Sequence, residues 1–221
     1  AFIETFEENG GEVRFNCGID KITTSGEKVT GVVTEDGEWI ETDWIVSNAD
    51  PITTCRNMIG EGNFPAGFLK KFRGSTVAPS SVNVYLGLAC PHEKLGFTAH
   101  ENFVNEGFDF DGCFEKLNRI ISPYTTLVTC YNMVYNEISP PGTSMVVLTS
   151  LSNSEPWINL APEQYVETKN RLAEQMMRMA ESIAPGIRQY VEKVEVATPL
   201  TNMRYTGALG GSIYGFNNHP H

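Results

Sequence analysis

The stretch TPLTNMRYTGALGGSIYGF, from Thr198 to Phe216, is the most distinctive part of this 221-residue chain. Its glycines at positions 207, 210 and 211 lack the Gly-x-Gly-x-x-Gly spacing of a dinucleotide-binding loop, and no strand-to-helix pattern surrounds them. Ser212 follows two glycines, but Tyr214 stands where a nucleophile elbow has its second glycine. The residues alone therefore assign no reaction to this stretch.

A helix and a strand are expected before this stretch. Proline suits a first helical turn, so a helix is expected from Pro162 to Ala184, ended by Pro185-Gly186, with a strand from Val191 to Ala197. One apolar stripe recurs along the helix at helical spacing, and its members are Tyr165, Leu172, Met176, Met179 and Ile183. Methionines could line a lipid channel, but core packing is the favoured interpretation.

The middle of the chain predicts an antiparallel sheet. Ser80 to Leu88 alternates apolar and polar residues, so one face of that strand should be buried. Thr125 to Val134 and Ser144 to Leu151 are β-rich runs joined by a loop with Pro140-Pro141-Gly142, and we expect them to pair. Ile52 to Ile59 and Ala66 to Phe72 are expected to be short helices. The fold class predicted is α+β, with a mixed, largely antiparallel sheet backed by helices.

Residues 12 to 47 predict a β-meander. We expect strands at Val13 to Phe15 and Trp44 to Val46, and between them at residues 19–24, 29–34 and 39–40, with turns at Ser25-Gly26 and Asp36-Gly37. Asp-Gly is a strong hairpin signal because both turn positions take positive φ at low cost. Asn48-Ala49-Asp50-Pro51 ends the pattern, since proline cannot continue the ladder.

Composition excludes several classes of function. The net charge of -11 would repel a nucleic acid backbone and disfavours an anionic membrane surface, although an apolar patch could still contact lipid. Five dispersed cysteines indicate reduced thiols in a cytoplasmic protein, and the four histidines share no metal-ligand spacing with cysteines or carboxylates. No apolar run approaches the ~20 residues of a membrane span.

Other catalytic templates also fail. Gly62 and Gly67 have the spacing of a phosphate loop, but Phe68 stands where the lysine is needed. Asp109 and Asp111 are expected to lie in a solvated turn. No catalytic residue is therefore assigned. Because the chain begins at Ala1 without a methionine and stops at His221 within a motif, we expect an interior piece of a longer protein.

A resemblance adds what the templates do not. Residues 198–215 resemble the T-P-x-T-x-x-R-Y-T-G-x-x-G-G-x-I-Y-G stretch of the phytoene desaturase, carotenoid isomerase and retinol saturase family of FAD-dependent oxidoreductases. The match identifies the superfamily well and its individual members poorly. The meander is similar to part of the family's flavin domain, through residues 10–15, 19–22, 31–33 and 43–51. Many flavoproteins share this meander.

The resemblance implies site residues and domain roles. The residue matching Ile19 lies by the adenine of FAD, and the turn Ser47-Asn48-Ala49 lies near the cofactor. Gly210 and Gly211 would allow close backbone approach to the cofactor or to a strand. The family's N-terminal dinucleotide loop and C-terminal Gly-Asp segment would lie outside these residues, so we expect the chain alone to retain no FAD and to be inactive.

Three segments follow from the resemblance. Residues 1–51 would be a flavin-domain remnant, 52–197 the substrate domain that forms a roof over the flavin ring, and 198–221 a return crossing. The flavin would exchange a hydride with a hydrophobic polyene in desaturation, saturation or isomerisation. Arg204 and Tyr205 are the candidates for polar groups near the substrate, with a structural ion pair as the alternative for Arg204, and Tyr214 would pack on the ring system or in the core.

Two rival interpretations remain open. The first is an amine-oxidase-like flavoprotein, because the meander is common to both groups and acidic charge suits a cationic amine. The second is a non-catalytic module that binds lipid or a partner. The substrate, the direction of hydride transfer and the oligomeric state are not predicted.

Overall fold

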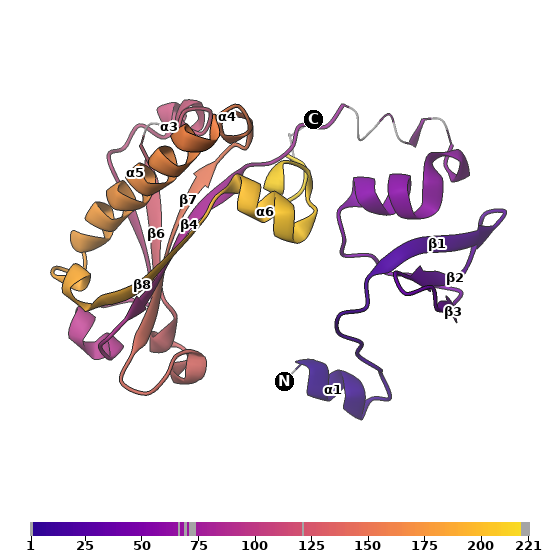
Figure 1. Ribbon diagram of the computed structural model, residues 1–221, viewed down its shortest axis with the longest axis horizontal. Coiled ribbons are helices and arrows are strands. Elements are labelled where there is room, and N and C mark those ends of the chain that lie inside the picture. Colours follow the sequence, from indigo (N-terminus) through magenta and orange to yellow (C-terminus); the bar gives the residue numbers. More distant parts are fainter. Residues whose placement is uncertain (1, 66, 69, 71–73, 121, 218–221) are drawn as a thin grey trace. The chain divides into compact units, whose positions relative to one another are not determined.

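The computed structural model describes residues 2–65, 67, 68, 70, 74–120 and 122–217. The chain divides into two compact units, Ala1–Ser75 (unit 1) and Thr76–His221 (unit 2). Each unit has its own sheet, and in both sheets every described pair of neighbouring strands is antiparallel (Figure 1). The α+β fold class is therefore confirmed.

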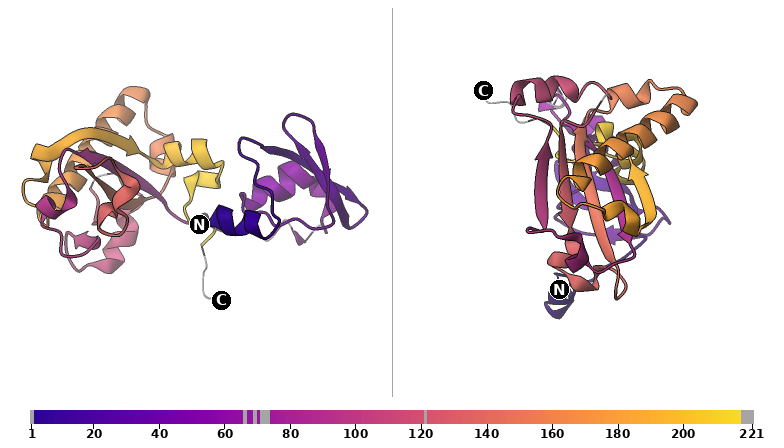
Figure 2. Two further views of the ribbon diagram at one scale, coloured as in Figure 1. Left: turned by 90° about the horizontal axis from the view of Figure 1, so that it is seen from below. Right: turned by 90° about the vertical axis from the view of Figure 1, so that its left-hand side faces the viewer.

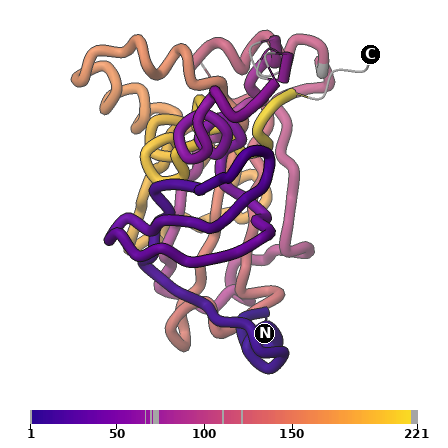
Figure 3. The backbone as a smooth tube through the Cα atoms, turned by 90° about the vertical axis from the view of Figure 1, so that its right-hand side faces the viewer, coloured from indigo at the N-terminus to yellow at the C-terminus, as the bar shows by residue number. Residues whose placement is uncertain are grey.

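Unit 1 is built on the predicted meander. After helix α1 (Phe2–Glu8), strands β1 (Ile19–Ser25), β2 (Lys28–Thr34) and β3 (Trp39–Glu41) follow one another in the order β1-β2-β3. The back-and-forth path of these strands is clear in the indigo and purple part of Figure 3. Gly26 and Gly37 both take positive φ in the connecting turns, as the sequence predicts for the hairpins.

Two predicted strands at the ends of the meander are wrong. Val13 to Phe15 forms no strand, because Phe15 and Asn16 form a turn in which Asn16 takes a φ of 53°. Trp44 to Val46 forms no strand either. There the Thr42 hydroxyl donates to the Trp44 carbonyl at 2.9 Å, so a side chain satisfies a backbone group that a ladder would otherwise bind.

A helix follows the meander where the sequence predicts one. Asp50 accepts hydrogen bonds from the N–H groups of Ile52 and Thr53, at 2.9 and 3.0 Å, and Pro51 is the first helical residue. The helix continues as a π-helix, η1 (Thr53–Gly60), and a 3-10 turn, η2 (Glu61–Asn63). The helix predicted for residues 66–72 falls largely outside the described residues.

Unit 2 is a five-stranded sheet with helices. Its strands are β4 (Ser80–Leu88), β5 (Glu101–Asn105), β6 (Thr125–Cys130), β7 (Ser144–Ser152) and β8 (Val191–Ala197), in the order β5-β6-β7-β4-β8. The predicted pairing of residues 125–134 with 144–151 is confirmed as β6 with β7. Its helices are α3 (Phe110–Lys116), α4 (Glu155–Ile158), α5 (Pro162–Glu181) and α6 (Pro199–Thr206), with 3-10 turns η3 (His92–Leu95), η4 (Tyr131–Met133), η5 (Asn136–Ile138), η6 (Ile187–Tyr190) and η7 (Leu209–Gly211).

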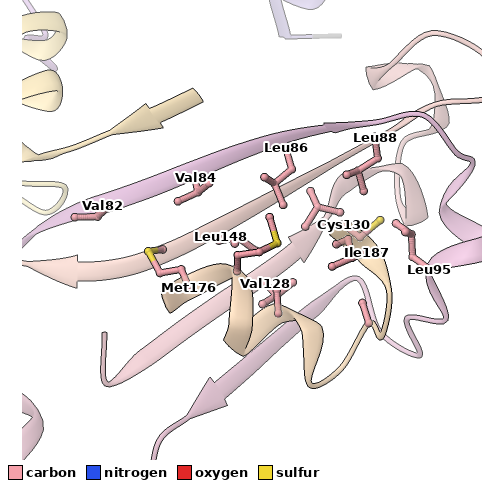
Figure 4. Close-up of a cluster of buried hydrophobic side chains, with 14 of the residues drawn as sticks. Val82, Val84, Leu86, Leu88, Leu95, Val128, Cys130, Leu148, Met176 and Ile187 are labelled. Atoms are coloured by element: carbon pink, nitrogen blue, oxygen red, sulfur yellow. The ribbon is translucent and has the colours of Figure 1, made fainter. Parts of the chain in front are cut away.

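The core of unit 2 lies between α5 and one face of the sheet (Figure 2). Alternate residues of β4 point to this face, and those at 82, 84, 86 and 88 are at most 2% exposed. Met176 of α5 is fully buried against Val128 and Leu148 in the same cluster (Figure 4). The methionines of the apolar stripe therefore contribute to the core, as the favoured interpretation has it.

The opposite face of the sheet, called the open face below, is largely exposed. Phe103, Tyr85 and Leu151 point to it and are 69%, 42% and 47% exposed, although all are large apolar or aromatic side chains. Single exposed apolar residues are ordinary, but such residues on three strands of one sheet face indicate a surface that binds a ligand or partner. The open face is therefore the first place to look for a ligand site.

An ion pair on the other face predicts how stability changes with pH. Two oxygens of Glu174 in α5 lie 2.8 and 2.9 Å from the guanidinium nitrogens of Arg188, and Arg178 lies 3.3 Å away. The hydrogen bond from Arg188 lowers the pKa of Glu174 from its ordinary value of 4.5. Glu174 thus has a lower pKa in the folded protein than in the unfolded chain. The ion pair therefore stabilises the folded protein at pH values above the unfolded pKa, and this stabilisation is lost as the pH falls through the folded pKa.

The Glu174→Gln substitution should therefore lower the free energy of unfolding by about 0.5 kcal/mol at neutral pH, a small value because the carboxylate is half exposed. The difference from the unaltered protein should shrink below about pH 4.5. Urea denaturation at several pH values measures it, with Glu167→Gln on the same helix as the control. A difference that stays constant down to strongly acid pH would contradict the assignment.

Candidate functional site

The first half of the distinctive stretch builds a capped helix. Thr198 is fully buried before α6, and its N–H donates to the hydroxyl of Thr201 at 3.1 Å. Pro199 occupies the first helical position, and Gly207 ends the helix with a φ of 66°. The pattern Thr-Pro-x-Thr with a following glycine therefore specifies where α6 begins and ends.

Hydrogen bonds from both halves of the stretch anchor this helix to the sheet. Asn202 donates to the Ser80 hydroxyl at 3.0 Å and to the Ser81 carbonyl at 3.2 Å, and the Ser80 hydroxyl donates to the Gly211 carbonyl at 2.5 Å. These bonds join α6, η7 and the start of β4. Several of the most distinctive residues of the chain thus hold its fold together.

Gly210 and Gly211 allow other parts of unit 2 to approach closely. Gly211 takes a φ of 61°, and a Cβ there would clash with the Pro199 carbonyl and lie 2.9 Å from the Met203 nitrogen, both in α6. A Cβ on Gly210 would lie 2.9 Å from the Ser154 hydroxyl. The Gly211 carbonyl also accepts the hydrogen bond from Ser80, the first residue of β4, so the close approach is to a helix, a loop and the start of a strand. Approach of these glycines to a cofactor stays a prediction.

The described ends of unit 2 lie side by side. Val77 forms a bridge with Phe216, Ala78 donates to the Gly215 carbonyl at 2.9 Å, and Asn217 donates to the Thr76 carbonyl at 2.8 Å. The chain therefore enters unit 2 next to the last described residues of the stretch.

Arg204 and Tyr205 lie on the exposed surface of α6. Tyr205 is 78% exposed, and the guanidinium carbon of Arg204 lies 5.8 Å from the centre of its ring. Within the described part of the chain, Arg204 forms no ion pair, so the structural alternative for this residue gains no support. The two side chains contact each other and do not line the apolar pocket that lies on the open face of the sheet.

That pocket, of about 480 Å³, lies on the open face and includes Tyr214. Its apolar side chains come from the strands β5, β6 and β7, from the residue that follows α3, and from the end of the stretch. They are Phe103, Leu117, Leu127, Leu151, Ile213 and Tyr214. We call this the open-face pocket. Its polar lining includes Asn105, Lys116, Tyr124 and Thr125, and no described residue that lines it is acidic.

Sequence reasoning missed most of this pocket. Strand β5 and helix α3 were not predicted, and they contribute Phe103 and Lys116. The alternation around Leu127 does indicate that it points away from Val128 and hence away from α5. The alternation therefore identifies the face of the sheet to which Leu127 points, but it does not predict that helix α3 lies at the same pocket.

In unit 1 the predicted cofactor residues lie in different surroundings. Ile19 lines a shallow pocket of about 370 Å³ with Ile40, Cys17, Arg14 and Glu12. The exposed turn Ser47-Asn48-Ala49 does not line that pocket, and the Ser47 hydroxyl lies 2.8 Å from the Thr54 hydroxyl.

Arg14 in the same pocket is held by two carboxylates. Its guanidinium lies 2.6 Å from Glu12 and 2.9 Å from Glu38, and these hydrogen bonds raise its pKa further. An adenine ring at this pocket would meet two isoleucines, and the charge of Arg14 there is already balanced by carboxylates.

No metal site is found in the part of the chain that the structure describes. Burial raises the pKa of the thiols of Cys55, Cys90 and Cys130, which favours the unreactive protonated form. No helix among the described residues is long and apolar enough to span a membrane.

Comparisons with curated proteins give relatives of low identity over nearly the whole chain. Prolycopene isomerase from Daucus carota is 22% identical over 213 residues, which are 94% of this chain and 32% of the relative. A 4,4'-diaponeurosporene oxygenase from Staphylococcus aureus is 25% identical over 216 residues, 95% of this chain and 41% of the relative. The chain thus spans about a third to two fifths of the length of these relatives.

Solved structures share the fold. An oxidoreductase from Methanosarcina mazei matches with a TM-score of 0.55 and 16% identity, over 89% of this chain and 40% of that one. A variant of putrescine oxidase matches with a TM-score of 0.53 and 10% identity, over 89% and 37%. The family model described as flavin containing amine oxidoreductase matches residues 1–204. Since that match covers most of the sequence, the chain belongs to the family of flavin-containing amine oxidoreductases.

Proposed function

We propose that the protein containing this chain is an FAD-dependent oxidoreductase that acts on a hydrophobic polyene of the carotenoid or retinoid kind. Membership of the flavin family supports the redox chemistry. The names of two relatives, a prolycopene isomerase and a diaponeurosporene oxygenase, support the substrate class. Desaturation, saturation and isomerisation all remain within this proposal.

The observation that carries the proposal is the chemistry of the open-face pocket. Phe103, Leu127 and Leu151 give it an apolar floor, and burying a polyene there would release about 25 cal/mol per Å² of apolar surface. A conjugated hydrocarbon has few polar groups, so the pocket must hold it by shape and apolar contact. This pocket would orient the substrate and exclude water while the flavin, when bound, accepts or donates the hydride.

The same pocket disfavours an amine substrate. A protonated amine binds where carboxylates line the site, but no described residue that lines this pocket is acidic and Lys116 is cationic. The pocket therefore favours an apolar substrate over a cationic amine.

The roles of the segments are part of the proposal. Residues 1–51 would belong to the flavin domain, 52–197 to the substrate domain, and 198–221 to the return crossing. The pairing of residues 76–79 with 213–217 gives unit 2 the close ends of an inserted domain. Unit 2 begins after residue 52 and includes the return crossing, so this pairing supports an insertion but not the bounds 52–197. Ile19 would contact the adenine, with the turn 47–49, Gly210 and Gly211 near the cofactor and Arg204, Tyr205 and Tyr214 near the substrate.

A cytoplasmic location with a peripheral lipid contact would suit a substrate that is insoluble in water. The 221 residues alone would retain no FAD and show no turnover. The full-length protein is therefore the material on which activity should be measured.

Anaerobic reduction of the flavin tests this function. The full-length protein is purified with FAD and mixed without oxygen with a conjugated polyene or with putrescine, and the visible absorbance of the flavin is followed. We expect the polyene to change this absorbance and putrescine to leave it unchanged. Reduction by putrescine alone would establish the amine-oxidase interpretation instead. A full-length protein that binds no flavin would establish the non-catalytic one.

A further inference from the structure

The open-face pocket has a polar end. Asn105, Lys116, Tyr124 and Thr125 gather where β5 ends and β6 begins, beside α3. The Thr125 hydroxyl donates to the Asn105 side-chain oxygen at 2.7 Å, so this hydroxyl already has an acceptor. Lys116 and Tyr124 bring two further donors to this end.

Tyr124 has a buried hydroxyl without a partner. The residue is 6% exposed, and its hydroxyl forms no hydrogen bond with the described part of the chain. Leaving such a group unpaired is unfavourable, and most buried hydroxyls in proteins are paired. Gly107 packs beside it: a Cβ there would lie 3.8 Å from the hydroxyl oxygen, at ordinary contact distance, and would offer it no hydrogen-bond partner.

Lys116 brings a second donor to the same end. Its ammonium nitrogen lies 4.6 Å from the centre of the Tyr124 ring and 3.4 Å from a carboxylate oxygen of Glu106. An ammonium group has three N–H donors, and the side chain is 41% exposed, so it can bind a further acceptor. Glu106 balances the charge of Lys116, which favours a neutral oxygen over a carboxylate at this end.

We propose that the open-face pocket selects a polyene whose end group carries a neutral oxygen, a carbonyl or a hydroxyl, that accepts hydrogen bonds from Lys116 and Tyr124. This inference rests on the proposed function and narrows its substrate class. The apolar remainder of the substrate lies along Leu127 and Leu151 toward Tyr214. A site with unpaired donors rejects an analogue that lacks the oxygen, because those donors then stay unsatisfied.

Binding of a matched pair of ligands tests the inference. The full-length flavoprotein is titrated with a conjugated polyene aldehyde and with the hydrocarbon of the same chain length, and each Kd is measured by fluorescence quenching. The aldehyde should bind about tenfold more tightly. Tyr124→Phe and Lys116→Met should each reduce this preference several-fold, and the double variant should abolish it.

Two matched variants serve as controls. Tyr131→Phe removes a hydroxyl from a 41% exposed tyrosine of η4 that does not line the pocket, and Lys193→Met removes an exposed lysine of β8. Both should retain the preference for the aldehyde. Loss of the preference in either control would show that it does not depend on the polar end, and would overturn the inference.

The outcomes separate this inference from the proposed function. Equal affinity for the two ligands would overturn the inference and leave the polyene function standing. Binding of neither ligand would overturn both. Thermal unfolding gives an independent check, because Tyr124→Phe deletes an unpartnered hydroxyl and should leave the melting temperature unchanged or raise it. A fall of several degrees would mean that the hydroxyl has a structural partner, which also overturns the inference.

Discussion

The Gly211→Val substitution should lower the free energy of unfolding of unit 2 by about 3 to 5 kcal/mol. Gly211 combines a positive φ with a position where a Cβ would clash with the backbone of α6. Valine must therefore adopt an unfavourable backbone conformation and also move the helix that Thr198 caps. Urea denaturation followed through the fluorescence of the fully buried Trp157 measures the loss.

Gly207→Ala is the matched control for this experiment. Gly207 also has a positive φ, of 66°, but a Cβ there would have nothing within 4 Å. Only the cost of placing an alanine at a positive φ remains, so the free energy of unfolding should fall by about 1 kcal/mol. Equal losses in the two variants would show that close packing of Gly211 on α6 contributes nothing.

The Leu127→Glu substitution should reduce turnover of a polyene about a hundredfold while the protein keeps its flavin. Leu127 lies in the floor of the open-face pocket, between Phe103 and Thr149 on the neighbouring strands. A carboxylate there must lose its hydration when an apolar chain covers it, which costs about 3 kcal/mol or more. Steady-state turnover and the flavin content of the purified variant are the two measurements.

Val166→Glu is the control for Leu127→Glu. Val166 lies on α5, is 52% exposed and does not line the open-face pocket, so the same charge there should leave turnover unchanged. If Leu127→Glu keeps full turnover, the polyene does not bind on this face of the sheet.

The helices and turns that depend on neighbouring residues in the sequence were predicted correctly. The helix from Pro162 and the turns at Gly26 and Gly37 follow from proline, glycine and periodicity, and all are found. The strand predicted at Trp44 to Val46 failed although its residues favour β-structure. Strand formation needs a partner, and Trp44 and Val46 are 88% and 99% exposed with no ladder beside them.

The site was predictable only in part, for a similar reason. The sequence marked residues 198–216 as distinctive, but the hydrogen bonds that anchor them to the sheet depend on Ser80 and Ser81, more than a hundred residues earlier. The open-face pocket joins α3 to three strands, and no short pattern reveals the unpaired hydroxyl of Tyr124 or its distance from Lys116. Tertiary contacts create these features, so spacing along the chain cannot reveal them.

The most direct test of the account is a crystal structure of the full-length flavoprotein with a bound polyene. We predict that the polyene lies on the open face of the sheet of unit 2, in contact with Phe103, Leu127 and Leu151. A polyene bound elsewhere, such as in the groove between α5 and β8 or in the pocket of unit 1 at Ile19, would contradict it.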